Sequence, residues 1–195
     1  MMPDTDPLSP AARAVLRANV GHAYTRLVVP DVAADAAPVP PELTGLTPQT
    51  VLAAPPRSRD DAAAMLAGLW LWHDQLDASH RISQSLHTAT GSFWHAIMHR
   101  REGDFSNSQY WYARCANHPA LPVIAAQAGA LINAAPADKS TLQLTRHGWD
   151  GDAFVDFVAA VHEKPDEPRH TLAVALQQLE WRVLFDHCTR AASGG

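Results

Sequence analysis

Signals that start helices recur along this chain, whereas patterns typical of strands are scarce. A serine, threonine or aspartate precedes a helix-forming run at Ser9, Thr47, Ser58 and Asp150, and proline directly follows the first two. Such a side chain accepts a hydrogen bond from the free N–H groups of a first helical turn, and proline fits the first helical position. Alternating runs of β-branched residues are almost absent. We therefore predict an all-α fold of about eight helices with no substantial sheet.

The chain length favours one domain. Its 195 residues, 47% of them apolar, are enough to bury one sizeable core, so we predict a single helical domain over 1–195. Residues 28–46 contain four prolines and predict an extended strap across the surface. Residues 120–133 carry no charge, which predicts a buried helix or a surface for a second copy of the chain. The predicted helices run over about 10–18, 48–53, 59–83, 93–102, 104–115, 120–133, 151–162 and 171–190.

The overall charge argues against nucleic acid and membranes as partners. The formal net charge is -5 and the isoelectric point is about 6.1, so nothing attracts nucleic acid or anionic lipid to the chain as a whole. The N-terminal residues lack the basic start and apolar run of a signal peptide, and no apolar run reaches the roughly 20 residues of a membrane helix. Cys115 and Cys188 have no metal-binding spacing. These features predict a soluble, cytoplasmic protein.

Six of the eleven histidines fall in residues 72–118, a block that is also rich in acids, arginines and tryptophans. The spacing i, i+4, i+7 recurs on two predicted helices, as His73, Asp77 and His80 on the first and as His95, His99 and Glu102 on the second. This spacing places the three side chains of each set on one helical face. Because the connection is short, the two helices should pack as antiparallel neighbours and could turn these faces toward each other.

Imidazole and carboxylate groups one helical turn apart suit a divalent transition metal, because both donors can reach one ion. The predicted metal ligands are His80, His95, His99 and Glu102. The candidates for catalytic acid–base or ligand roles are His73, Asp77, His95, His99 and Glu102. The structural alternative is a network of ordinary hydrogen bonds, in which clustered histidines bind no metal.

Two metal-dependent families share part of this pattern. The pairs Asp77-x-x-His80 and His99-x-x-Glu102 resemble the carboxylate-x-x-His arrangement of di-metal helical bundles, although one pair runs in the reverse order here. His73-Asp74 resembles the core of the all-α HD phosphohydrolases, which need an earlier histidine, and here the candidate is His22. Our leading hypothesis is a domain that binds a metal or a small molecule, with hydrolase- or oxygenase-type chemistry.

Two further sets of residues have both a binding and a structural interpretation. Arg100 and Arg101 could clamp a carboxylate or phosphate, or could pair with nearby acids such as Glu102. Glu180, in the last predicted helix, is expected by default to be solvated, and the alternative is that it caps the polar cluster from across the bundle. Aromatic residues interleaved with the histidines could wall a ligand pocket, but at helical spacing they are more often core. These aromatic residues are Trp72, Trp94, Tyr110 and Trp111.

Residues 95–119 resemble a single tetratricopeptide hairpin, with Gly103-Asp104-Phe105 at the turn and Pro119 at the end. That resemblance covers about an eighth of the chain, and an array needs three or more copies. The wider block 72–119 also resembles the signature of an uncharacterised protein family, which implies no substrate. The alternative to a binding or catalytic site is therefore an interaction module whose polar cluster is structural.

Overall fold

The computed structural model describes residues 6–18, 20, 24–29, 38–135 and 139–195. Over these residues the chain forms ten α-helices, eight of them with seven or more residues, and no strand belongs to a sheet, which confirms the predicted all-α class. The helices are α1 (Pro10–Arg17), α2 (Pro41–Gly45), α3 (Arg59–Trp72), α4 (Leu76–Ser83), α5 (Ala89–Glu102), α6 (Phe105–Tyr112), α7 (Ala120–Ala134), α8 (Lys139–Gln143), α9 (Gly151–Val161) and α10 (Pro168–Ser193), with a 3-10 turn at Ala113–Cys115.

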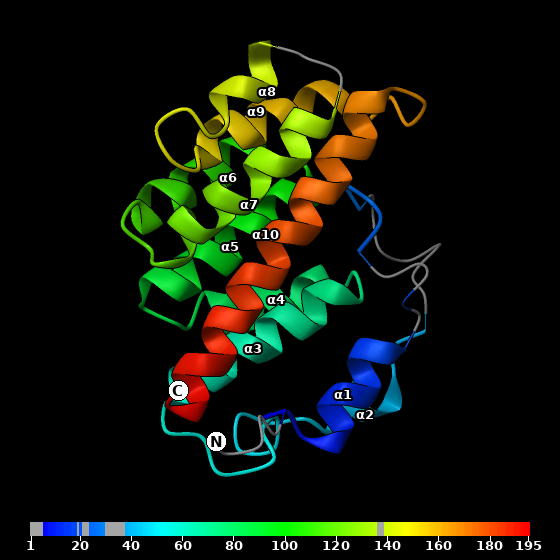
Figure 1. Ribbon diagram of the computed structural model, residues 1–195. Coiled ribbons are helices and arrows are strands. Elements are labelled where there is room, and N and C mark those ends of the chain that lie inside the picture. Colours follow the sequence, from blue (N-terminus) through cyan, green and yellow to red (C-terminus); the bar gives the residue numbers. More distant parts are fainter. Residues whose placement is uncertain (1–5, 19, 21–23, 30–37, 136–138) are drawn as a thin grey trace.

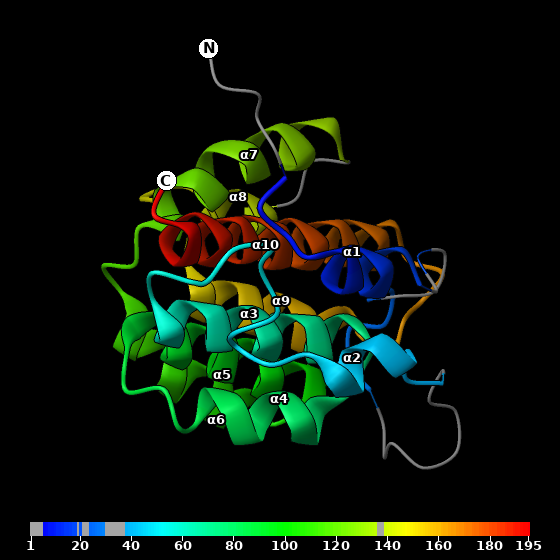
Figure 2. The same cartoon turned by 90° about the horizontal axis from the view of Figure 1, so that it is seen from below.

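The longest helix, α10, runs through the middle of the molecule. Figure 2 shows α7 on one side of α10 and α3 with α9 on the other, and α10 contacts all three. Farther from α10, α3 packs on α4, α4 on α5, and α5 on α6. One cluster of buried apolar side chains joins these layers. At its centre Gly68 of α3 allows close packing, because an added Cβ would lie 2.8 Å from the Trp94 ring.

The predicted helix over 59–83 is wrong in one respect, because it breaks into α3 and α4. Asp74, with φ 59°, lies between them in the left-handed region, which aspartate tolerates better than most residues. Arg101, on α5, stabilises this break. Its guanidinium donates to the Asp74 carboxylate at 2.6 Å and to the Leu71 carbonyl at 2.8 Å. The break turns His73 away from the face that carries His80.

Three other predictions need correction. Residues 48–53 form a turn instead of a helix, and Leu52 pairs with Leu8 in an isolated β-bridge. Within the strap predicted over 28–46, α2 forms at residues 41–45, where Pro41 occupies the first helical position; residues 30–37 lie outside the described residues. The charge-free helix α7 buries only one face, since Val123 is 40% exposed.

Most predicted helix ends are confirmed. Ser9, Ser58 and Asp150 accept a backbone N–H at the starts of α1, α3 and α9, as the sequence predicts. The start of α5 lies earlier than predicted, with Thr88 as its cap, and Gly103 ends the helix at φ 88°. In the described part of the chain, no helix combines the length and the apolar character needed to cross a lipid bilayer.

Candidate metal centre

Helices α4 and α5 bring three histidines together. His80 comes from α4, while His95 and His99 lie one turn apart on the facing side of α5. One ring nitrogen from each histidine lies within 4.8 Å of those of the other two. Among the residues that the structure describes, this group alone unites three or more histidine, cysteine, aspartate or glutamate side chains that could hold a metal ion. We call His80, His95 and His99 the histidine cluster.

Aromatic stacking fixes the rings of the cluster. The His95 ring lies 4.8 Å from the His99 ring and 4.0 Å from the Trp111 ring, with an interplanar angle of 16° in both pairs. His95 is therefore held between Trp111 and His99. His95 and His99 are buried, whereas His80 is partly exposed. The cluster therefore meets solvent on the side of α4.

Hydrogen bonding distinguishes the nitrogens of the cluster. The Glu102 carboxylate lies 2.9 Å from Nδ1 of His99. If that nitrogen carries the proton, it donates to the carboxylate and Nε2 is left as a free lone pair, as in many metal-binding histidines. Nδ1 of His95 is buried and has no hydrogen-bond partner in the described structure. Burying a polar atom without a hydrogen-bond partner destabilises the fold. A ligand bound to Nδ1 of His95 would remove this cost.

The electrostatics of the cluster favour uncharged rings at His95 and His80. Burial, and then the neighbouring His99 and His80, lower the pKa of His95 to about 4. Burial and then His99 also lower the pKa of His80, against the opposing effect of Glu102 and Asp77. Neutral imidazole is the form that binds metals. In a tetrahedral zinc site with Zn–N bonds of about 2.0–2.1 Å, the nitrogens lie about 3.3 Å apart, so the ring nitrogens would have to approach one another by up to about 1.5 Å.

Three other predicted site residues lie outside this ligand set. His73 is buried, and its Nε2 lies 2.9 Å from the carbonyl oxygen of Val15. This hydrogen bond joins the end of α3 to α1. Asp77 is exposed on α4 and affects His80 only through its charge. Glu102, predicted as a fourth ligand, lies against His99 instead. His22, the histidine that an HD phosphohydrolase core would need, lies outside the described residues.

The structure contradicts the anion-binding interpretation of the two arginines. Arg100 and Arg101 are both 0% exposed, so neither guanidinium can reach a ligand in solvent. Their predicted pairing with acids close in sequence is also wrong. Arg100 pairs with Glu180 at 2.6 Å, and Arg101 pairs with Asp74 at 2.6 Å and stacks on the Tyr24 ring. Both arginines are therefore structural.

Of the four predicted pocket aromatics, Trp111 is the one that contacts the histidine cluster. Trp94 is fully buried and packs on Trp181, so it belongs to the core. Trp72 also packs on Trp181, at a ring distance of 4.5 Å, away from the cluster. Tyr110 is 52% exposed, and its ring stacks under the Arg114 guanidinium at 3.5 Å.

The sequence interpretation missed a second polar group, which we call the arginine–glutamate network: Arg100, Tyr112, Trp149 and Glu180. The default expectation for Glu180, a solvated position, is wrong, because Glu180 is 0% exposed. Its carboxylate accepts hydrogen bonds from Arg100, from Trp149 at 3.1 Å and from the Tyr112 hydroxyl. The apolar residues Leu176, Val183 and Leu184, at i−4, i+3 and i+4 from Glu180, are the signal that could have indicated its burial.

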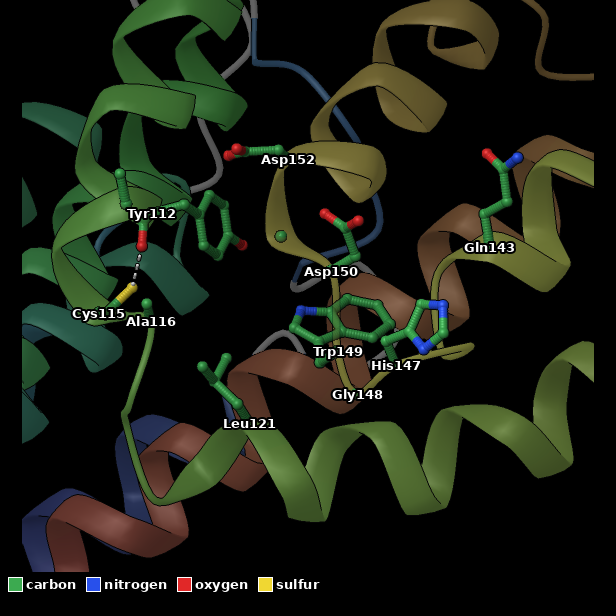
Figure 3. Close-up of a pocket in the computed structure, with 12 residues that line it drawn as sticks. Tyr112, Cys115, Ala116, Leu121, Gln143, His147, Gly148, Trp149, Asp150 and Asp152 are labelled. Carbon is green, nitrogen blue, oxygen red and sulfur yellow. Dashed lines mark hydrogen bonds between the residues drawn. The ribbon is translucent and has the colours of Figure 1, made fainter.

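The network lies beneath a surface pocket of about 290 Å³. Tyr112 and Trp149 line the pocket from α6 and from the loop before α9 (Figure 3). Cys115 also lines it, and burial, before the effect of Glu180, raises the pKa of this thiol to about 12. A protonated thiol that donates to the Tyr112 carbonyl is a packing group and not a nucleophile.

A further buried histidine, His118, has all its partners. The backbone N–H of Ala120 donates to Nδ1 at 3.1 Å, so Nε2 carries the proton and donates to the Thr90 hydroxyl at 3.1 Å. Burial, and then the nearby His187, lower the pKa of His118 to about 4. This histidine resembles His95 in burial and pKa but has no free nitrogen.

Comparisons with protein-family models, with curated proteins and with solved structures found no match to this chain, an outcome consistent with an uncharacterised family.

Proposed function

We propose that this protein binds a divalent transition metal through His80, His95 and His99. The observation that carries the proposal is the convergence of one ring nitrogen from each of three histidines within 4.8 Å of one another, together with a buried Nδ1 of His95 that lacks a partner. Three imidazoles are a common protein ligand set for zinc and suit other first-row metals. Glu102 would act as a positioning residue that holds the His99 ring and its tautomer.

A three-histidine site with solvent on one side suits metal-assisted chemistry. Three protein ligands leave at least one coordination position for water or substrate, and such water loses a proton near neutral pH. The partial exposure of His80 supports access from the α4 side. Hydrolysis is the reaction class that needs only these parts. An oxygenase type of reaction would need a redox-active metal at the same position.

The alternative is an interaction module, based on the likeness of residues 95–119 to a tetratricopeptide hairpin. Helices α5 and α6 do pack against each other across the Gly103 turn. In such a module the cluster would be a set of satisfied hydrogen bonds, as at His118. The unpartnered nitrogen of His95 favours the metal site over this alternative.

The test is the metal content of untagged protein, measured by mass spectrometry after incubation with zinc, iron(II) or manganese and gel filtration. We expect about one ion per chain in the wild type. The double variant His95→Ala/His99→Ala should retain none. The matched control is His87→Ala/His170→Ala, which removes two histidines outside the cluster and should bind metal like the wild type.

A second measurement locates the ion. Because Trp111 stacks on His95, bound Cu²⁺ or Co²⁺ should quench its fluorescence, and Trp111→Phe should remove most of the quenching. A folded wild type that takes up none of the metals, or a cluster variant that binds as much as the wild type, would overturn the proposal.

A further inference from the structure

A groove of about 500 Å³ is lined by residues of α3 and α4, and none of its lining residues belongs to the histidine cluster. Along α3 it is lined from Arg59 to Trp70, and along α4 and the turn after it from Ala78 to Leu86. Pro48 also lines the groove. The volume lies in the range of small-molecule sites, which is about 300–1,000 Å³.

The floor of the groove is apolar. Leu66 is 5% exposed and Leu86 is 9% exposed, and both contribute to the main core. The Trp70 and Ile82 side chains, also on the floor, are only partly buried. A ligand with an apolar body would remove their remaining exposed surface from water, which is favourable by roughly 25 cal/mol for each Å².

The rim of the groove carries two arginines that the fold does not use. Within the described residues, the side chains of Arg59 and Arg81 make no hydrogen bond and no ion pair, in contrast to those of Arg13, Arg100 and Arg101. Asp60 is the acid that lines the same groove. Two guanidinium charges and one carboxylate leave a single positive charge at the rim of an otherwise acidic protein.

We propose that this groove binds a small aryl carboxylate. The aromatic body would lie on Trp70 and Ile82, and a guanidinium at the rim would bind the carboxylate, an acceptor that arginine recognises with two parallel hydrogen bonds. The single net charge selects a monocarboxylate over a phosphate ester, because Asp60 would repel a second negative charge. The proposal does not depend on a metal in the histidine cluster.

The binding test compares two probes of the same shape, 3-phenylpropionate and its neutral amide, by calorimetry and by ¹H–¹⁵N chemical-shift titration. We expect saturable binding of the acid and about tenfold weaker binding of the amide, because the neutral amide lacks the charge that a guanidinium binds. The shifted resonances should fall in α3 and α4. Equal binding of acid and amide would overturn the proposal, as would the absence of saturation up to the solubility limit.

Variants then identify the residues. Arg59→Gln and Arg81→Gln should each weaken the acid and leave the amide unchanged, with a loss of about five- to tenfold for whichever guanidinium makes the main contact. Arg146→Gln, an exposed arginine in another part of the molecule, is the matched control and should bind like the wild type. Loss of affinity in the control, or unchanged affinity in both groove variants, would contradict the assignment. The cluster variant His95→Ala/His99→Ala should still bind the acid, so the two proposals can fail separately.

Discussion

Helix α5 contributes residues to two buried polar groups, which differ in how many hydrogen bonds their key polar atoms make. Arg100 belongs to the arginine–glutamate network, in which the Glu180 carboxylate receives three donors in a fully buried position. One residue earlier, His99 belongs to the histidine cluster, in which a buried nitrogen of His95 has no partner. Burial and a shifted pKa are common to both regions. What separates the two regions is that three donors already bind the Glu180 carboxylate, whereas nothing in the described part of the chain binds Nδ1 of His95; within the network, Nε of Arg100 is the one buried nitrogen without a partner.

The largest expected effect comes from breaking the arginine–glutamate network. Glu180→Ala leaves the Arg100 charge buried without its counterion, so the free energy of unfolding should fall by about 3–5 kcal/mol. Urea denaturation followed by circular dichroism measures this loss. Glu163→Ala, which removes an exposed acid, is the control and should change stability by less than about 0.5 kcal/mol. A loss below about 1 kcal/mol for Glu180→Ala would mean that the network contributes little.

The next largest effect concerns His118, the buried histidine with hydrogen bonds at both ring nitrogens. Its pKa is about 4 in the fold against 6.5 for a free histidine, so the unfolded chain takes up the proton first as pH falls. Stability is therefore lost between about pH 6.5 and pH 4, by up to about 3 kcal/mol. Denaturation midpoints across this window should fall less steeply in His118→Gln than in the wild type or in the exposed-site variant His87→Gln. Parallel curves in all three proteins would refute the prediction.

Metal binding at the histidine cluster should stabilise the fold. At a free metal concentration 100 times the Kd, the gain is about 2.7 kcal/mol, which raises Tm by about 5–11 °C for a chain of this size. Differential scanning calorimetry with and without zinc measures the shift. The variant His95→Ala/His99→Ala should show none, and an equal shift in that variant would place the ion elsewhere.

The smallest expected effect tests Glu102 as a positioning residue. Glu102→Gln keeps the shape but weakens the hold on His99, so the metal Kd should rise by about 10–100-fold. Its side chain is 52% exposed, so stability without metal should be nearly unchanged. Competition with a chromophoric chelator measures the Kd. Glu163→Gln serves as the control. An unchanged metal Kd for Glu102→Gln would show that the contact between Glu102 and His99 does not position the ligand.

Local chemistry made much of the fold predictable. A cap such as Ser58 or Asp150 acts within three residues, so its effect can be read directly from the sequence. The same is true of His95, His99 and Glu102, which one regular helix holds at fixed angles. His80 depended in addition on the packing of α4 against α5, which the short connection between them indicated.

The errors arose where distant residues determine the local structure. The sequence predicts one helix through His73, but Arg101, which lies 27 residues after Asp74, stabilises the break that follows α3. Glu180 looks like a surface acid until its partner Arg100, 80 residues away, is known. Residues 48–53 begin like a helix, yet pairing of Leu52 with Leu8 holds them as a turn. No pattern within a short window contains these partners.

The direct succession of His99, Arg100 and Arg101 has a consequence for how this chain can change in length. An α-helix turns by about 100° per residue, so one inserted or deleted residue between His99 and Arg100 would rotate the histidines away from the partners of the arginines. Arg100 is held by α10, and Arg101 by the end of α3 and by the carbonyl of Arg26. The second half of α5 therefore has no freedom to slide. Insertions and deletions should be tolerated in the surface loops and excluded from this one turn of helix.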